Sequence, residues 1–262
     1  MSLNEADTRA QLIDSKLKNP GWSDSLISRE HFYRRDQPYT AGRIYLLGDE
    51  ARRRKPRRVD YLLRYSDAFP IAVVEAKDEN HSPNAGLEQA KRYARDLGLA
   101  FAYSSNGHGI VEYDFFSHSS RDLSAFPTPE ELWRRWRQNT GLSRADLPGV
   151  HEARDTYTAD RFTNPLLHPY CPKSKCGKEP FYFQETAISQ VVQRMMRGQR
   201  RILLAMATGT GKTFVAFQIA WKLVRSGWLN GLHQERPGRV LFLADRVGLR
   251  DQAYNNFSPF AD

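Results

Sequence analysis

The chain has 262 residues, of which 40% are hydrophobic and 12% aromatic, so it can fill real cores and wholesale disorder is excluded. Its 39 lysines and arginines exceed its 30 acidic residues, and the formal net charge of +9 favours polyanionic partners such as nucleic acid. No apolar stretch approaches the roughly 20 residues that a membrane span requires, and two cysteines exclude a disulfide scaffold. We therefore expect a cytoplasmic protein without a membrane segment, built from one large domain or two ordinary ones.

Hydrophobic periodicity and turn residues predict an α/β pattern in the first half of the chain. Ala6, Ile13 and Leu17 lie on one stripe at helical spacing. Asn106-Gly107 is a favourable hairpin turn between two short apolar segments. From such signals we expect a helix over residues 5–18, strands over 43–47, 58–65 and 71–77, a helix over 84–97, strands over 99–104 and 109–115, and a helix over 128–139.

A change in composition divides the chain. From Gly141 to Pro180 the periodicity disappears and prolines recur, which indicates an irregular connection. Beyond it we expect a helix over 184–197, an apolar strand over 202–206, a helix over 212–226 and a second apolar strand over 239–244. Strand, helix and strand in this order form a parallel α/β unit. We therefore predict a first domain over residues 1–145, a linker over 146–180 and a second domain over 181–262.

The expected strand at 71–77 carries charges that are unusual for a buried strand. Side chains alternate between faces, so Glu75 and Lys77 point the same way, and burying both is costly unless they have a use. Asp60 lies on the preceding strand, so its carboxylate can approach Glu75. Two adjacent carboxylates repel, and Mg²⁺ would relieve the repulsion and activate a water to attack a phosphodiester. Lys77 would orient that water and offset the developing negative charge.

This constellation resembles the D…ExK core of the PD-(D/E)xK nucleases, with Val59 where the family's proline would stand. Gln89 and Tyr93 lie four residues apart on one helical face, and they resemble the accessory Q-x3-Y pair of the exonuclease-like branch. The resemblance implies that both reach towards the active site and the DNA backbone. Glu5, on the first helix, is a further candidate acid. Alternatives stay open here: a surface salt bridge for the Asp-Glu-Lys pattern, a Tyr93 that only packs on the sheet, and helix surface charge for Glu5.

The segment Ala207-Thr-Gly-Thr-Gly-Lys-Thr213 follows an expected apolar strand and opens the next expected helix, which is the context of a phosphate-binding loop. Glycines let backbone amides curl around the β- and γ-phosphates of ATP, aided by the helix N-terminus. Lys212 supplies positive charge to those phosphates, and the Thr213 hydroxyl can bind Mg²⁺. The expected nucleotide-binding residues of this loop are Thr208, Gly209, Thr210, Gly211, Lys212 and Thr213.

The segments on either side of the loop resemble those of superfamily 2 motors. The aromatic segment that ends at Gln184 resembles one in which a glutamine contacts adenine, and the resemblance implies this role for Gln184. The segment around Arg246 resembles a motif that grips the DNA backbone, with Arg246 as the phosphate contact. Each segment could instead be ordinary core and helix surface. Arg57 and Arg58 end a basic run that could also contact phosphate, although such a run is more often a solvated loop.

The order of these parts resembles the R subunit of type I restriction–modification enzymes. The resemblance implies an α/β protein with a restriction-endonuclease-like mixed sheet flanked by helices, followed by an incomplete RecA-like parallel α/β motor domain. It also implies Mg²⁺-dependent cleavage of double-stranded DNA, ATP-dependent translocation, and partnership with methylation and specificity subunits. No acidic box follows the phosphate loop, so we expect the front end of a longer protein, one that binds ATP weakly without turning it over.

Three alternatives remain at the level of sequence. Another nuclease–helicase fusion, acting in DNA repair or phage defence, would carry the same motifs. A catalytically silent DNA-binding scaffold would use the basic residues and the motor half only for docking. His168, Cys171 and Cys176 could hold a metal, but structural zinc requires four ligands, so a plain loop is the favoured interpretation.

Overall fold

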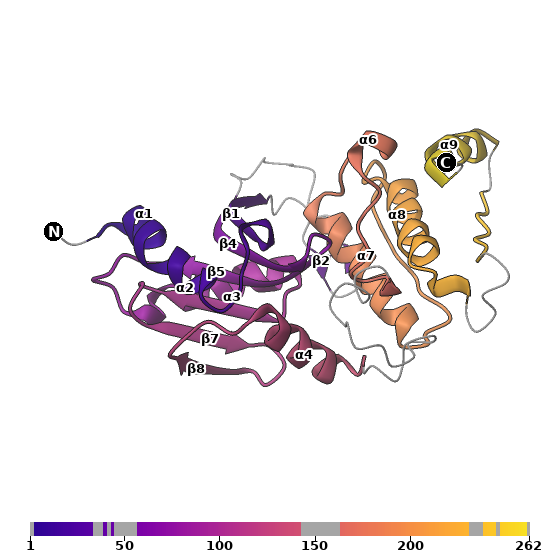
Figure 1. Ribbon diagram of the computed structural model, residues 1–262. Coiled ribbons are helices and arrows are strands. Elements are labelled where there is room, and N and C mark those ends of the chain that lie inside the picture. The colour runs from indigo at the N-terminus through magenta and orange to yellow at the C-terminus, as the bar shows by residue number, and fades with distance from the viewer. Residues whose placement is uncertain are drawn as a thin grey trace. The chain divides into compact units, whose positions relative to one another are not determined.

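The computed structural model in Figure 1 describes residues 3–33, 39–40, 43–44, 57–142, 163–230, 238–244 and 247–260. The chain forms two compact units. The first comprises Met1–Tyr39 and Tyr45–Gly141, and the second comprises Thr40–Ile44 and Leu142–Asp262. The boundary expected at residue 145 lies outside the described residues, so the three sequence-based domain limits stay predictions.

A six-stranded mixed sheet forms the centre of the first unit (Figure 1). Its strands lie in the order β1-β4-β5-β6-β7-β8. β5 and β6 are parallel, and the other neighbouring pairs are antiparallel. A separate short pair joins β2 (Tyr39–Thr40) to β3 (Arg43–Ile44). The six strands are β1 (Ile27–Tyr33), β4 (Arg57–Ser66), β5 (Phe69–Ala76), β6 (Phe101–Ser105), β7 (Ile110–Asp114) and β8 (Ser119–Leu123). This mixed sheet with flanking helices confirms the expected α/β fold class.

Helices precede the sheet of the first unit and connect its strands. Asn4 caps the first of them by accepting a hydrogen bond from the Asp7 amide at 2.9 Å. The helix expected over 5–18 is present, but a π-helical turn interrupts it. The helical elements are α1 (Glu5–Thr8), the π-helical turn η1 (Arg9–Ile13), α2 (Asp14–Lys18), η2 (Asp24–Leu26), η3 (Pro83–Gly86), α3 (Leu87–Leu97) and α4 (Pro129–Thr140).

Two helices pack on opposite faces of the sheet. α3 makes the crossover between parallel strands β5 and β6, and it lies on the face that carries Glu75. Gly98, with φ of +69°, ends it in the left-handed conformation that glycine adopts without penalty. α4 lies on the other face, where the Trp133 ring stacks on Tyr65 and meets Phe69 edge-on. The buried aromatic rings hold α4 on its face of the sheet. On the opposite face, which α3 covers, polar side chains remain.

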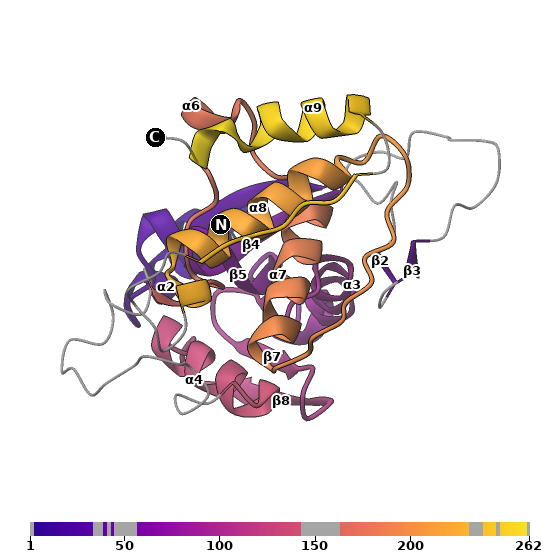
Figure 2. The same cartoon turned by 90° about the vertical axis from the view of Figure 1, so that its right-hand side faces the viewer.

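Apart from Thr40 of β2 and the strand β3, the regular secondary structure in the described residues of the second unit is helical. Figures 1 and 2 show α7 and α8 side by side, with α9 against α8. Phe214, Phe217 and Trp221 of α8 form its apolar core together with Cys171. The elements are α6 (Lys173–Cys176), α7 (Tyr182–Met196), α8 (Lys212–Arg225), η5 (Trp228–Asn230), α9 (Val247–Phe257) and η6 (Ser258–Phe260). No helix in the described ranges is long and apolar enough to cross a bilayer.

Two strand predictions in this unit are wrong. Residues 202–206 and 239–244 pair with no strand among the described residues. Leu203 is 87% exposed and Leu241 is 82% exposed. An apolar segment becomes a buried parallel strand only when neighbours hydrogen-bond along both edges and helices cover its faces, and the described part of the chain gives these segments no such neighbours. Of the strand expected over 43–47, only Arg43–Ile44 lies within the described residues.

The sequence patterns missed several elements, among them β1, β8 and α9. β1 is an edge strand whose central residues Arg29 and Glu30 are exposed, so it has no apolar alternation to recognise. β8 is the opposite edge strand and is almost wholly exposed. Edge strands tolerate polar residues because one edge faces water. Periodicity is therefore weakest where the sheet ends.

Candidate functional site

The candidate nuclease residues meet where β4 and β5 lie side by side. The antiparallel register pairs Tyr61 with Val74, which places Asp60 opposite Glu75. Asp60 Oδ2 accepts a hydrogen bond from the Ala76 amide at 2.8 Å. The structure therefore brings together the two carboxylates that the sequence placed on neighbouring strands.

Both carboxylates are buried, and one of their oxygens lacks a partner among the described residues. Asp60 is 4% exposed and Glu75 is 3% exposed. No group in the described ranges donates a hydrogen bond to Glu75 Oε2. Burial, and then the nearby charge of Asp60, raises the pKa of Glu75 to about 7. A buried acceptor without a donor, beside a second carboxylate, is an environment that a cation would stabilise.

Lys77 follows β5 directly and completes the cluster. Its amide donates to the Ser105 carbonyl at 2.9 Å, which extends the pairing with β6 beyond the strand end. Its Nζ donates to Glu75 Oε1, also at 2.9 Å. Burial alone would lower the pKa of Lys77, but the hydrogen bond and charge of Glu75 raise it above the ordinary value. The ammonium is thus a fixed positive charge at the edge of the carboxylate pair.

α3 contributes the two accessory residues. Gln89 Nε2 donates to Tyr93 Oη at 2.9 Å, as their spacing of four residues allows. Burial raises the pKa of Tyr93, and the charge of Glu75 acts in the same direction. Tyr93 is therefore both packed on the sheet and close enough to Glu75 to respond to its charge. The two interpretations of this residue are compatible.

Gly86 was not singled out in the sequence, yet it lies against the site. A Cβ at this position would lie 2.8 Å from Glu75 Cγ and 3.0 Å from Lys77 Cε. Its φ is −91°, so glycine is required by space and not by backbone conformation. Glu5, the further candidate acid, acts electrostatically on both Glu75 and Lys77. No sequence signal marked Gly86, because only the fold brings it against β5.

Of the three arginines expected to bind DNA, Arg57 and Arg58 are among the described residues and Arg246 is not. Arg57 pairs with Asp96 at 3.2 Å, and Arg58 pairs with Glu30 at 3.2 Å. Both guanidinium groups keep part of their surface exposed, so they can still face a polyanion. The rest of the basic run and Arg246 lie outside the described residues.

In the second unit, the glycine loop has the conformation of a tight turn before α8. Gly209 and Gly211 have φ values of +80° and +82°, which glycine adopts freely. Lys212 opens α8, and its Nζ donates to the carbonyls of Met206 and Ala207 at 3.2 and 3.1 Å. The ammonium thus folds back over the loop, where it can meet an anion held by the loop amides. Thr208 and Thr213 flank the turn at its two ends.

Gln184 contacts this loop directly. Its Nε2 donates to the Thr210 carbonyl at 2.8 Å, and its Oε1 accepts from the Phe181 amide at 3.0 Å. A Cβ at Gly211 would lie 2.6 Å from Gln184 Nε2, so this glycine also provides the space for the contact. The structure places Gln184 beside the glycine loop, while its contact with adenine stays a prediction.

Lys222 of α8 is fully buried and anchors the segment before α6. Its Nζ donates to the carbonyls of Leu166 and His168 at 3.2 and 2.6 Å, and it lies 4.2 Å from the centre of the Tyr170 ring. Burial lowers its pKa from 10.5 to about 7, although the charge of Glu185 acts in the opposite direction. A buried lysine of this kind makes folding depend on pH.

Between pH 7 and 10.5 the contribution of Lys222 to the free energy of unfolding is expected to rise. In this window the unfolded chain holds a proton that the folded chain does not, whereas below pH 7 both hold it. The free energy of unfolding of wild type minus that of Lys222→Met should therefore become more positive as the pH rises through this window. Urea unfolding of both proteins at several pH values measures this slope. Parallel pH profiles would contradict the lowered pKa.

Cys171 lies just before α6, and Cys176 is the last residue of α6. Within the described residues, no group of three or more His, Cys, Asp or Glu side chains could hold a metal. Cys171 is buried, and Cys176 Sγ donates to the carbonyls of Cys171 and Lys178, both at 3.1 Å. This arrangement agrees with a packed loop. Because the described residues group no third His, Cys, Asp or Glu with Asp60 and Glu75, a cation there would take its other ligands from water, as Mg²⁺ commonly does.

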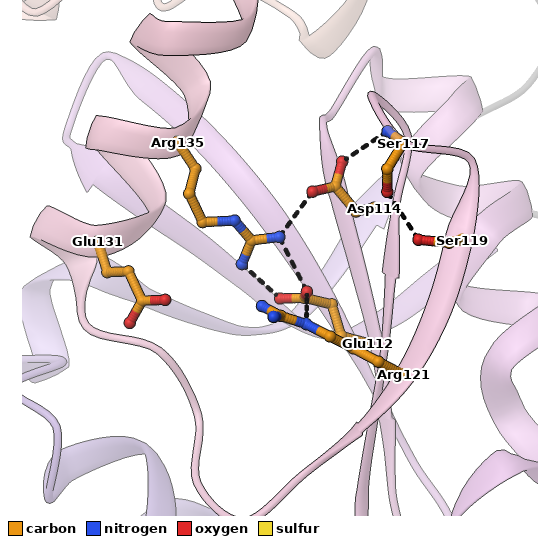
Figure 3. Close-up of a pocket in the computed structure, with 7 residues that line it drawn as sticks. All are labelled: Glu112, Asp114, Ser117, Ser119, Arg121, Glu131 and Arg135. Atoms are coloured by element: carbon orange, nitrogen blue, oxygen red, sulfur yellow. Dashed lines mark hydrogen bonds and ion pairs between the residues drawn. The ribbon is translucent and has the colours of Figure 1, made fainter.

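A polar pocket of about 250 Å³ lies elsewhere on the first unit (Figure 3). The Arg135 guanidinium spans Glu112 and Asp114, with contacts of 2.7 to 2.9 Å, and Arg121 donates to Glu112 from the other side. Tyr103 Oη donates to Glu112 at 2.6 Å. Figure 3 shows these charged groups directed at one another, so we interpret the cluster as a link between α4 and the β7–β8 hairpin.

Comparison with known proteins supplies evidence independent of this geometry. Residues 177–262 match the family model described as "Type III restriction enzyme, res subunit". Over 99% of its length the chain is 34% identical to the EcoAI type I restriction enzyme endonuclease subunit of Escherichia coli, of which it spans 29%. It is 28% identical, over 98% of its length, to the EcoKI type I endonuclease subunit of E. coli strain K12, of which it spans 24%. The chain thus spans less than a third of these curated relatives.

A solved structure is similar over the whole chain. It is a fragment from Vibrio vulnificus YJ016 whose title gives it as a putative HsdR subunit of a type I restriction enzyme. The sequence identity is 40% and the TM-score is 0.76, with 100% of this chain and 44% of that chain covered. The similarity in sequence and in structure extends across both units and so concerns their order as well as their folds.

Proposed function

Over its whole length the chain is a homologue of part of the endonuclease subunit of type I restriction enzymes, and on that premise we propose a two-part activity. The first unit cleaves double-stranded DNA with Mg²⁺, and the second binds ATP as one part of the motor that drives translocation along DNA in the whole enzyme. The observation that carries the nuclease half is the buried pair Asp60 and Glu75, with one oxygen unpartnered within the described residues and Lys77 beside it. Unlike the fully paired Glu112, Glu75 keeps a buried oxygen that no described group satisfies, and this cost favours a bound cation over a scaffold without chemistry.

The residues of the pair fit a divalent cation. Glu75 Oε2 is a buried acceptor that no group in the described ranges satisfies, and Asp60 keeps lone pairs besides those used by its hydrogen bonds. Mg²⁺, bound by Asp60, Glu75 and waters, would supply an activated water and charge stabilisation for a phosphodiester. Lys77 would hold that water by its ammonium and offset the negative charge that develops on the phosphate. Gln89 and Tyr93 would orient the DNA backbone at the edge of the pair.

In the second unit, ATP would replace the loop carbonyls as the partner of Lys212. The ammonium lies over the turn, so only a local side-chain rotation is needed for it to meet a phosphate. Thr213 would offer its hydroxyl to the Mg²⁺ that accompanies the nucleotide, and Gln184 would contact the base while its link to Thr210 holds the loop.

Lys212→Ala is expected to weaken binding of Mg·ATP by about 10- to 100-fold, because a hydrogen bond to a charged group contributes roughly 1.5–3 kcal/mol. Titration with a fluorescent ATP analogue measures the affinity. Lys173→Ala, an exposed lysine of α6, is the matched control and should bind as wild type does. Equal affinity in all three proteins would contradict the phosphate role. ATP hydrolysis that Lys212→Ala abolishes would contradict the expectation of binding without turnover.

The named relatives are subunits of larger enzymes. We therefore place the chain in a complex with methylation and specificity subunits, which would choose the DNA sequence. Arg57 and Arg58 would contribute phosphate contacts near the nuclease site, and Arg246 would do so in the motor. Nicking of supercoiled plasmid by the chain in the presence of Mg²⁺ tests the nuclease proposal, and its absence at all Mg²⁺ concentrations would contradict it.

A further inference from the structure

Ion pairs connect Asp60, one of the two candidate nuclease carboxylates, to Glu30 through Arg9. Arg9 Nη1 donates to Asp60 Oδ1 at 3.0 Å, and Arg9 Nη2 donates to Glu30 Oε1 at 3.2 Å. Arg58 also donates to Glu30 Oε1, at 3.2 Å. The Arg9 side chain is only 16% exposed. One half-buried guanidinium therefore connects Asp60, in the sheet, to Glu30 on the edge strand β1.

Two backbone irregularities place this guanidinium. The π-helical turn η1 begins at Arg9 and interrupts an otherwise α-helical segment, and such turns occur frequently at functional sites. Glu30 has φ of +52°, a left-handed conformation that is rare for a residue with a side chain. β1 pairs with β4 on both sides of it, Arg29 with Tyr61 and His31 with Val59, so the kink lies opposite Asp60. Both irregularities thus converge on the same carboxylate.

The consequence is that Asp60 is held at both oxygens. The Ala76 amide fixes Oδ2 and Arg9 fixes Oδ1, so the carboxylate cannot rotate while both contacts persist. Each oxygen still has a second lone pair for a cation. Metal ligands whose orientation is fixed by neighbouring hydrogen bonds bind more tightly than free ones.

We propose that Arg9 is a positioning residue of the nuclease site. Its guanidinium, anchored by Glu30, fixes the Asp60 carboxylate in the orientation in which Asp60 and Glu75 bind a divalent cation. This inference rests on the proposed nuclease function and assigns a part of the site that lies outside the D…ExK and Q-x3-Y pattern.

The competing explanation is that Arg9 merely takes the place of the cation. A substitute cation would be expected between the two carboxylates. Arg9 instead contacts Asp60, whereas Glu75 Oε1 is paired with Lys77 and Glu75 Oε2 receives no donor from the described residues. The geometry therefore favours positioning. The two explanations predict opposite changes in metal affinity when Arg9 is removed.

The test measures binding of Mn²⁺ to the whole chain by calorimetry, with Mg²⁺ as competitor. Arg9→Met is expected to weaken binding by about 10- to 100-fold, the usual effect of losing a residue that orients a metal ligand. Arg9→Lys should recover only part of the affinity, because one ammonium cannot replace the guanidinium fork between two acids. Arg29→Met is the matched control, since Arg29 also bridges two acids, Asp14 and Asp24, away from the site.

Glu30→Gly separates positioning from folding. Glycine accepts a φ of +52° without strain, which offsets part of the two ion pairs that the variant loses. The variant should therefore remain folded, with a melting temperature close to that of wild type, while Arg9 loses its anchor. Its Mn²⁺ affinity is expected to fall, by less than in Arg9→Met. In plasmid nicking, Arg9→Met should raise the Mg²⁺ concentration needed for half-maximal rate, and saturating Mg²⁺ should restore much of that rate.

Unchanged or tighter Mn²⁺ binding in Arg9→Met, with a clear loss in Glu75→Gln, would overturn the role of Arg9 alone. Unchanged binding in both Arg9→Met and Glu75→Gln would overturn the proposed metal site, and the role of Arg9 with it. A loss of affinity in Arg29→Met equal to that in Arg9→Met would also overturn the assignment, because it would show a general effect of lost ion pairs.

Discussion

Replacing Lys77 with alanine is expected to lower the rate of Mg²⁺-dependent DNA nicking by about 10²- to 10³-fold, the usual effect of removing one fixed group that stabilises transition-state charge. Lys77 Nζ is held 2.9 Å from Glu75 Oε1 in a half-buried position, so its charge is already oriented before DNA binds. The rate is measured as conversion of supercoiled plasmid to nicked circles. The effect should appear at saturating Mg²⁺ as well, because Lys77 is not a proposed metal ligand.

Two comparisons make the Lys77 experiment decisive. Lys91→Ala is the control, since Lys91 pairs with the exposed Glu88 on α3 and should nick DNA at the wild-type rate. Asp60→Ala should lose activity as Lys77→Ala does, because it removes one of the two carboxylates. Equal rates in wild type, Lys77→Ala and Asp60→Ala would leave only the DNA-binding scaffold as an explanation of the first unit.

Arg135→Ala is expected to lower the free energy of unfolding by about 3–5 kcal/mol, the usual result of removing one partner of a buried ion pair. Burial alone would raise the pKa of Glu112, yet hydrogen bonds from Arg135 and Tyr103 hold it below the ordinary value. Without Arg135, the fully buried Glu112 and its neighbour Asp114 would lose their main counter-charge. Urea unfolding followed by tryptophan fluorescence measures the loss, since Trp133 lies on the same helix.

The neighbouring residue provides the control for Arg135. Arg134→Ala removes an exposed arginine from the same helix and should change the free energy of unfolding by less than about 0.5 kcal/mol. Arg135→Met combined with Glu112→Leu should be far less destabilising than Arg135→Ala alone, because no buried charge is left unpaired. A small effect of Arg135→Ala would show that water reaches the pocket in Figure 3 and solvates Glu112.

The sequence predicted four of the six strands of the large sheet, β4 to β7, and named most of the candidate residues that the structure brings together at β4, β5 and α3. Strands β4 and β5 were expected because their apolar runs are long, and the alternation of side chains along a strand is enough to place Glu75 and Lys77 on one face. The helices α3, α4, α7 and α8 were expected from spacing and caps. The glycine loop was recognisable because its chemistry depends on consecutive residues, which the sequence shows directly.

Other features depend on contacts between distant segments. The edge strands β1 and β8 follow no apolar pattern, and the segments 202–206 and 239–244 follow one without pairing to any described strand. A strand is stabilised by its neighbours, so its own residues cannot decide whether it forms. For the same reason no local pattern could have revealed that Gly86 lies against Glu75.

What the sequence alone determined is therefore the inventory of reactive groups and their local order: two carboxylates and a lysine on adjacent strands, and a glycine-rich loop with a lysine before a helix. What only the tertiary structure decided is how those groups are held. Arg9 reaches Asp60 across 51 positions of sequence, and Gln184 reaches Thr210 across 26. Such contacts depend on how separate elements pack, and packing is a property of the whole fold that no short window of residues records.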